Sequence, residues 1–190
     1  MVRIGFIVEG HCEKAVLGSQ AFQQTLTAMG LTNVSEVANA KGKYNLANDV
    51  ATSLAQIIRD RGAEHIIVLR DLDDLPDLKS AEQEVIQAND VSVCVAVQEL
   101  EAWFLADSAT LSTVFKTDFS FDSPENESDP LTKLKEFSRQ FRQGRGIDDK
   151  RQFTNLMLAN GFSIERAAAH PNCPSARYFL STLQTLASAN

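Results

Sequence analysis

Acidic residues follow three apolar segments of this 190-residue chain, at the point where each segment ends. Glu9 follows the first segment, Asp71 and Asp73 follow the second, and Glu99 and Glu101 follow the third. Carboxylates that are brought together repel one another unless a cation neutralises them. Hard oxygen ligands without histidine or thiolate suit Mg²⁺ or Mn²⁺, ions that support phosphoryl chemistry. Acids at strand ends are also common as loop residues and helix caps, and this alternative stays open.

Strand-like and helix-like patterns alternate over the first 107 residues, and they define the elements that must position these acids. The predicted strands are Arg3–Val8, Asn33–Ala38, His65–Leu69 and Val91–Val97. The predicted helices are Glu13–Ala28, Leu46–Arg61, Leu78–Ala88 and Ala102–Ala106. This alternation is typical of an α/β domain, here with a Rossmann-like, mostly parallel four-stranded sheet flanked by helices.

In an open parallel sheet, functional groups gather at the carboxyl ends of the strands. If the first and third predicted strands are neighbours, Glu9 lies within a few ångströms of Asp71 and Asp73. Residues two apart in an extended segment face the same side, so we expect Asp71 and Asp73 to converge. Glu13 comes one helical turn after Glu9 and can share its face.

The pattern changes after Asp107, and we predict a core at residues 1–107 and a loop with a helical cap at 108–190. Leu131–Phe141, Phe153–Leu158 and Ala176–Ala187 are the predicted helices of the cap, with a turn at Gly144–Gly146. A basic stretch is either a solvated helix face or a contact for the nucleic-acid backbone. It comprises Lys133, Lys135, Arg139, Arg142, Arg145, Lys150 and Arg151.

The composition narrows the classes of function. A net charge of −7 and a pI near 5.0 argue against binding nucleic acid by bulk electrostatics alone. Three widely separated cysteines form no zinc or disulfide pattern, which favours a reducing cytoplasm. No segment approaches the roughly 18 continuous apolar residues of a membrane helix, so we expect no membrane partner.

The sequence resembles a known family at this point. Val8-Glu9-Gly10 with Glu13-Lys14, followed by Asp71-Leu72-Asp73, is similar to the Toprim fold of topoisomerases, bacterial primases and overcoming-lysogenisation-defect (OLD) nucleases. The run Glu99 to Asp107 and the later Cys173-Pro174-Ser175 resemble a group of uncharacterised bacterial Toprim-like proteins. The resemblance covers residues 3 to 107 well and the remainder loosely.

The resemblance implies roles for individual residues. Glu9 would be the characteristic Toprim glutamate, and Asp71 and Asp73 the metal-binding aspartates. Glu13 would help to hold a metal, and Glu101, or less favourably Glu99, would support a second ion. OLD-type nucleases also use a late lysine near the phosphate, for which we select Lys150, although the surrounding sequence departs from the expected tyrosine-containing pattern.

The sequence therefore predicts a Mg²⁺- or Mn²⁺-dependent phosphodiesterase, a nuclease with DNA favoured over RNA. The resemblance implies an ATPase partner as a separate chain, since no Gly-x-x-x-x-Gly-Lys loop is present, and a role in phage defence. The main alternative is a non-catalytic module of a multiprotein complex. Nucleotidyl transfer and a phospho-acceptor receiver domain fit less well, and a homodimer is one of the open oligomeric states.

Overall fold

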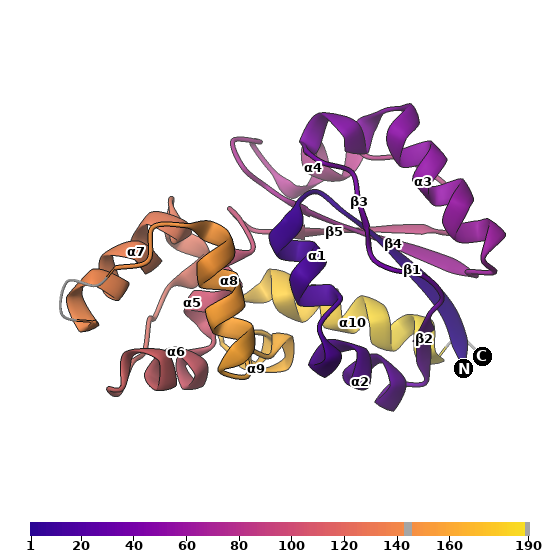
Figure 1. Ribbon diagram of the computed structural model, residues 1–190. Coiled ribbons are helices and arrows are strands. Elements are labelled where there is room, and N and C mark those ends of the chain that lie inside the picture. Colours follow the sequence, from indigo (N-terminus) through magenta and orange to yellow (C-terminus); the bar gives the residue numbers. More distant parts are fainter. Residues whose placement is uncertain (143–145, 189–190) are drawn as a thin grey trace.

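A parallel β-sheet forms the centre of the computed structural model, which describes residues 1–142 and 146–188 (Figure 1). Four strands lie side by side in the order β2, β1, β4, β5, and β3 pairs with the end of β1. Every pairing is parallel, which confirms the predicted α/β class. The strands are β1 (Val2–Val8), β2 (Leu31–Asn33), β3 (Ala38–Asn39), β4 (His65–Asp71) and β5 (Val91–Ala96).

The sheet has five strands where four were predicted, because the segment Asn33–Ala38 is not one strand. The chain pairs with the start of β1 through β2, leaves the sheet at the polar residues Ser35 and Glu36, and pairs again through β3. β1 and β4, the first and third predicted strands, are neighbours in the register Val8 to Leu69. The condition for bringing Glu9 near Asp71 is therefore met.

Helices cover both faces of the sheet, and a further group lies beyond the carboxyl ends of its strands (Figure 1). One face carries α3 (Asp49–Asp60) and α4 (Leu78–Gln83), and the other carries α1 (His11–Leu17), α2 (Gln20–Ala28) and α10 (Pro174–Ser188). Two short 3₁₀ helices, η1 (Lys43–Ala47) and η2 (Pro124–Asn126), lie in the connections. The group at the strand ends is α5 (Glu101–Ala106), α6 (Ser108–Phe115), α7 (Pro130–Phe141), α8 (Lys150–Ala159) and α9 (Ile164–Ala169).

Several predicted helix boundaries were wrong for local reasons. The helix expected from Glu13 to Ala28 is broken after Gly18, and Ser19 caps α2 by accepting a hydrogen bond from Phe22 N. α4 ends five residues before the predicted Ala88, and the Gln87 side chain beyond its end donates to the carbonyls of Glu82 and Val85. α6 and α9 were not predicted.

One continuous hydrophobic cluster joins the sheet to the C-terminal helices. It runs from Phe6 of β1 through Trp103 of α5 to Phe179 of α10, and these three side chains are fully buried. The smaller cluster under α3 and α4 uses Ile58, whereas Val50 and Ile57 of the same helix are 40% and 51% exposed. In residues 1–142 and 146–188, no helix has both the length and the apolar character needed to cross a membrane.

Candidate metal centre

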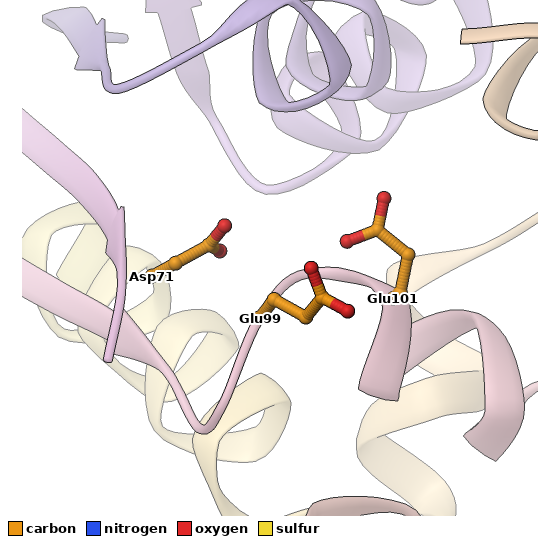
Figure 2. Close-up of side chains that lie close together, drawn as sticks. All are labelled: Asp71, Glu99 and Glu101. Atoms are coloured by element: carbon orange, nitrogen blue, oxygen red, sulfur yellow. The ribbon is translucent and has the colours of Figure 1, made fainter. Parts of the chain in front are cut away.

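Three carboxylates from two chain segments meet at the carboxyl end of the sheet (Figure 2). Asp71 is the last residue of β4, Glu99 lies in the turn after β5, and Glu101 begins α5. Each offers an oxygen atom, and the three atoms lie within 4.8 Å of one another. The backbone N–H of Leu100 donates to Asp71 Oδ1 at 2.9 Å and holds the turn after β5 against the end of β4.

Lys150, at the start of α8, reaches the same group of acids. Its Nζ lies 2.9 Å from Glu101 Oε2, 3.3 Å from Glu99 Oε2 and 3.8 Å from Asp71 Oδ2. Burial lowers the pKa of the Lys150 ammonium, but the negative charges of Glu101 and Asp71 raise the pKa by a larger amount. The pKa therefore lies above its ordinary value. Lys150 is thus a charged internal counter-ion of the acidic group, and its role beside a phosphate stays a prediction.

Glu101 is the most deeply buried member of the group. Its side chain is 1% exposed, the Lys150 ammonium lies against Oε2, and Oε1 accepts no hydrogen bond from the residues that the structure describes. Burial raises the pKa of Glu101 from 4.5 to about 7, against the opposing effect of Lys150. Burial, followed by the charge of Glu13, also raises the pKa of Asp71 well above its usual value. The cluster therefore carries more negative charge than Lys150 alone neutralises.

Glu9 and Glu13 extend the acidic cluster toward β1. Burial, Asp73 and Glu13 together raise the pKa of Glu9 from 4.5 to about 7. The Oε2 atom of Glu9 is buried and accepts no hydrogen bond within the described part of the chain. Glu13 is 3% exposed, and its carboxylate lies over Gly10, where an added Cβ would meet Glu13 Oε2 at 2.9 Å.

Asp73 does not join Asp71 in the group of three, contrary to the expectation that their carboxylates converge. β4 ends at Asp71, and Asp73 has a φ of 51°, so the segment between them is not extended. The Asp73 carboxylate instead pairs with Lys43 of η1 at 3.3 Å. Its remaining link to the cluster is electrostatic, through the raised pKa of Glu9.

Glu99, the weaker candidate from sequence, takes the place beside Asp71 and Glu101 that Asp73 was expected to hold. Glu99 Oε1 accepts a hydrogen bond from Leu131 N at 2.8 Å, which links the turn after β5 to α7. In the sequence, Glu99 and Glu101 stand two apart like Asp71 and Asp73. The two pairs differ in structure because the backbone N–H of Leu100 holds the turn that carries Glu99 against Asp71. No sequence pattern shows this contact.

A comparison with protein-family models shows which family the chain belongs to. A family model described as "Domain of unknown function (DUF4276)" matches residues 8–184. The chain belongs to the DUF4276 family. No curated protein and no solved structure matches it significantly. The family description names no activity, so the resemblance to Toprim proteins stays a prediction.

The motif that follows the acidic group in this DUF4276 domain has a structural role. Trp103 is fully buried and donates through Nε1 to Ser175 Oγ at 2.8 Å, while Ser175 donates to the buried Glu125. Asp107 accepts two hydrogen bonds from Arg166, at 2.8 and 2.9 Å. Only Glu99 and Glu101 of the run from Glu99 to Asp107 therefore belong to the acidic cluster, and Trp103 and Asp107 fasten α5 to α10 and α9.

The basic stretch of this DUF4276 domain is partly neutralised by acids. Lys133 pairs with Glu136 at 3.1 Å, and Arg139 pairs with Asp148. Arg145 and most of the predicted turn at Gly144–Gly146 lie outside the described residues. Within residues 1–142 and 146–188, the members of the stretch without an ion pair are Lys135, Arg142 and Arg151.

Proposed function

We propose that this DUF4276 protein is a divalent-metal-dependent phosphodiesterase that acts on nucleic acid. The observation that carries the proposal is the group formed by Asp71, Glu99 and Glu101, whose oxygens lie within 4.8 Å of one another at the carboxyl end of a parallel sheet. This edge is where α/β domains place their ligands.

The residues present fit a hard divalent cation. The donor set consists of carboxylate oxygens, which Mg²⁺ and Mn²⁺ prefer. Glu9 Oε2 and Glu101 Oε1 are buried and have no hydrogen-bond donor among the described residues, which is a costly state for a buried polar atom. Burial raises the pKa of both carboxyl groups to about 7, and a nearby cation would restore their ionised form.

The side chains of the cluster would have separate roles in binding the cation and the phosphate. Asp71, Glu99 and Glu101 would hold the cation, and Glu9 with Glu13 supplies a second acidic pair for another ion. A bound cation would polarise a phosphoryl oxygen and lower the pKa of the attacking water. The Lys150 ammonium would bind a phosphate oxygen once the cation has replaced it as the partner of Glu101, and would stabilise the charge that develops during cleavage.

Nucleic acid is the proposed substrate because the sequence around Glu9 and around Asp71 resembles that of Toprim proteins. The basic residues Lys135, Arg142 and Arg151 are available near α7 and α8 for contacts with a phosphate backbone. An ATPase partner and a role in phage defence rest on the same resemblance.

A cleavage assay with labelled single- and double-stranded DNA and RNA in Mg²⁺ or Mn²⁺ tests the proposal. We expect cleavage by the wild type and loss of at least about 100-fold in Asp71→Asn and Glu101→Gln. Asp118→Asn, which changes an exposed carboxylate in the loop after α6, is the matched control and should cleave normally. Equal cleavage by Asp71→Asn and the control would refute this site.

A second candidate is a non-catalytic module that assembles a complex. Lys150 already neutralises part of the cluster without a metal, and the net charge of −7 disfavours nucleic acid on most of the surface. Calorimetry with Mn²⁺ separates the two candidates. Binding that Asp71→Asn abolishes supports the enzyme, whereas absent binding together with absent cleavage supports the assembly module.

A further inference from the structure

A cavity with both apolar and charged walls lies on the face of the sheet that carries α3 and α4, at the end of β4. It has a volume of about 430 Å³ and is formed by η1, the end of β4, the loop after β4 and the end of α4. Arg70 of β4 directly precedes Asp71 and faces this cavity, whereas Asp71 faces the metal centre on the other side of the strand. The polar and aromatic lining consists of Lys43, Tyr44, Arg70, Asp74 and Glu84.

Arg70 is a buried hydrogen-bond donor with unused capacity. The residue is 1% exposed, and its Nε donates to Asp71 O at 3.1 Å while Nη1 donates to Ala81 O at 3.1 Å and to Glu84 Oε2 at 3.2 Å. The Nη2 atom is buried and has no acceptor among the residues that the structure describes. A buried N–H group without an acceptor is unfavourable, so an acceptor atom on a ligand would stabilise this arrangement.

The other walls offer complementary groups. Tyr44 of η1 is 82% exposed, unusually high for a large aromatic residue, and its ring is free to stack on a planar ligand. Asp74 is exposed and makes no hydrogen bond or ion pair within residues 1–142 and 146–188. Its carboxylate and that of Glu84 can therefore accept hydrogen bonds from a ligand.

The charges around the cavity favour a neutral ring over a phosphate. Lys43 is already paired with Asp73 at 3.3 Å, and Arg70 is paired with Glu84. The remaining carboxylate, Asp74, would repel an anion. A nucleobase avoids this repulsion, because its edge carries both acceptors and donors. Guanine offers O6 and N7 as acceptors for arginine, and N–H groups on its other edge for a carboxylate.

We propose that this cavity is a nucleobase subsite that prefers guanine, with Tyr44 stacked on the ring, Arg70 donating to an acceptor on the base, and Asp74 or Glu84 accepting from its N–H groups. The assignment rests on the proposed function, since it gives a nucleotide of the substrate a place beside the metal centre. Arg70 and Asp71 lie at the carboxyl end of β4, so a nucleic-acid strand would have to pass around this end of the sheet to contact both.

Calorimetry with mononucleotides in EDTA tests the subsite without the metal. We expect GMP to bind more tightly than IMP, which lacks the 2-amino group, and more tightly than AMP, which lacks the O6 acceptor. Tyr44→Ala should weaken GMP binding about fivefold or more, and Tyr44→Phe should retain it. Tyr44 is exposed, so its removal should leave folding intact, whereas Arg70 is too buried for a simple substitution to be informative.

Tyr178→Ala is the matched control, because Tyr178 is 54% exposed on α10 and lines a different cavity. Equal binding of GMP and AMP would overturn the proposal, and so would unchanged GMP binding in Tyr44→Ala or an equal loss in Tyr178→Ala. Failure here differs from failure of the proposed function, which is measured by Mn²⁺ binding and its loss in Asp71→Asn.

Discussion

The Nζ atom of Lys150 lies 2.9 Å from Glu101 Oε2, so a lysine from α8 neutralises a carboxylate from the first turn of α5. The same ammonium approaches Asp71 and Glu99, the other two acids of the group. Two kinds of cation can thus stabilise these carboxylates. A divalent ion must compete with Lys150, and the released ammonium is then free to bind an anion.

Replacement of Lys150 by Met tests this competition. We expect Mn²⁺ to bind several-fold more tightly, since the internal cation is gone, while cleavage is lost because the phosphate has lost its charged partner. The metal-free protein should lose on the order of 2 kcal/mol of unfolding free energy. This is less than for a fully buried pair, because the Lys150 side chain is 31% exposed.

Calorimetry with Mn²⁺ and urea unfolding in EDTA measure these two effects. Arg151→Met is the matched control, since Arg151 is exposed on the same helical turn and should change neither quantity by a comparable amount. Weaker Mn²⁺ binding in Lys150→Met than in wild type would contradict the competition.

Gly10 provides a second test because its Cα lies against the Glu13 carboxylate. A Cβ at this position would stand 2.9 Å from Glu13 Oε2, so Gly10→Ala must displace that carboxylate. The end of a flexible side chain can move at small cost, and we expect a loss of unfolding free energy below about 1 kcal/mol. Mn²⁺ binding and cleavage should fall by about tenfold or more if Glu13 is a ligand. Normal Mn²⁺ binding in Gly10→Ala would exclude Glu13 from the metal centre.

The architecture was predictable from local patterns, whereas the exact composition of the acidic group was not. Continuous apolar runs identify β1, β4 and β5, and their acidic ends point to the edge where Glu9, Asp71 and Glu101 lie. These features depend on alternation and on parallel pairing, which are visible in sequence.

Asp73 and Glu99 show where sequence reasoning failed. The prediction for Asp73 assumed an extended chain, but the backbone turns into the left-handed region at this residue and directs it to Lys43. The contact of Leu100 with Asp71 brings Glu99 into the group, and it depends on tertiary packing of β5 against β4. Neither a single φ angle nor such a long-range contact leaves a periodic signal.

Ser175→Ala tests the structural role of the motif around Trp103. Ser175 Oγ lies 2.8 Å from Trp103 Nε1 and 2.6 Å from Glu125 Oε1, so its removal leaves a buried N–H and a buried carboxylate short of a partner. We expect a loss of about 2 kcal/mol of unfolding free energy in urea titrations. Ser181→Ala, on the exposed side of α10, is the control and should lose less than about 0.5 kcal/mol. An unchanged free energy of unfolding in Ser175→Ala would argue against this role.

The raised pKa values of Glu9 and Glu101 predict that the metal-free protein is more stable in mild acid than in mild alkali. Both carboxyl groups titrate near pH 7 in the folded protein, against 4.5 for an unperturbed glutamate, so folding takes up protons between these values. The stabilisation from protonation is fully present below pH 4.5 and is lost as the pH rises through 7. Carboxyl groups with lowered pKa values, such as Asp77 and Asp90, change the free energy of unfolding with pH only below about pH 4. They therefore do not offset this trend.

Urea unfolding in EDTA between pH 5.5 and pH 8 measures the effect, and we expect a fall in unfolding free energy on the order of 2 kcal/mol over this range. The double variant Glu9→Gln/Glu101→Gln removes two of the carboxyl groups with raised pKa values, leaves Asp71, and should make the profile shallower. Saturating Mn²⁺ should reverse the wild-type slope, because the ion binds the ionised carboxylates and stabilises the folded state more strongly as the pH rises. A metal-free wild type whose stability increases from pH 5.5 to pH 8 would show that these carboxyl groups are already neutralised within the folded chain.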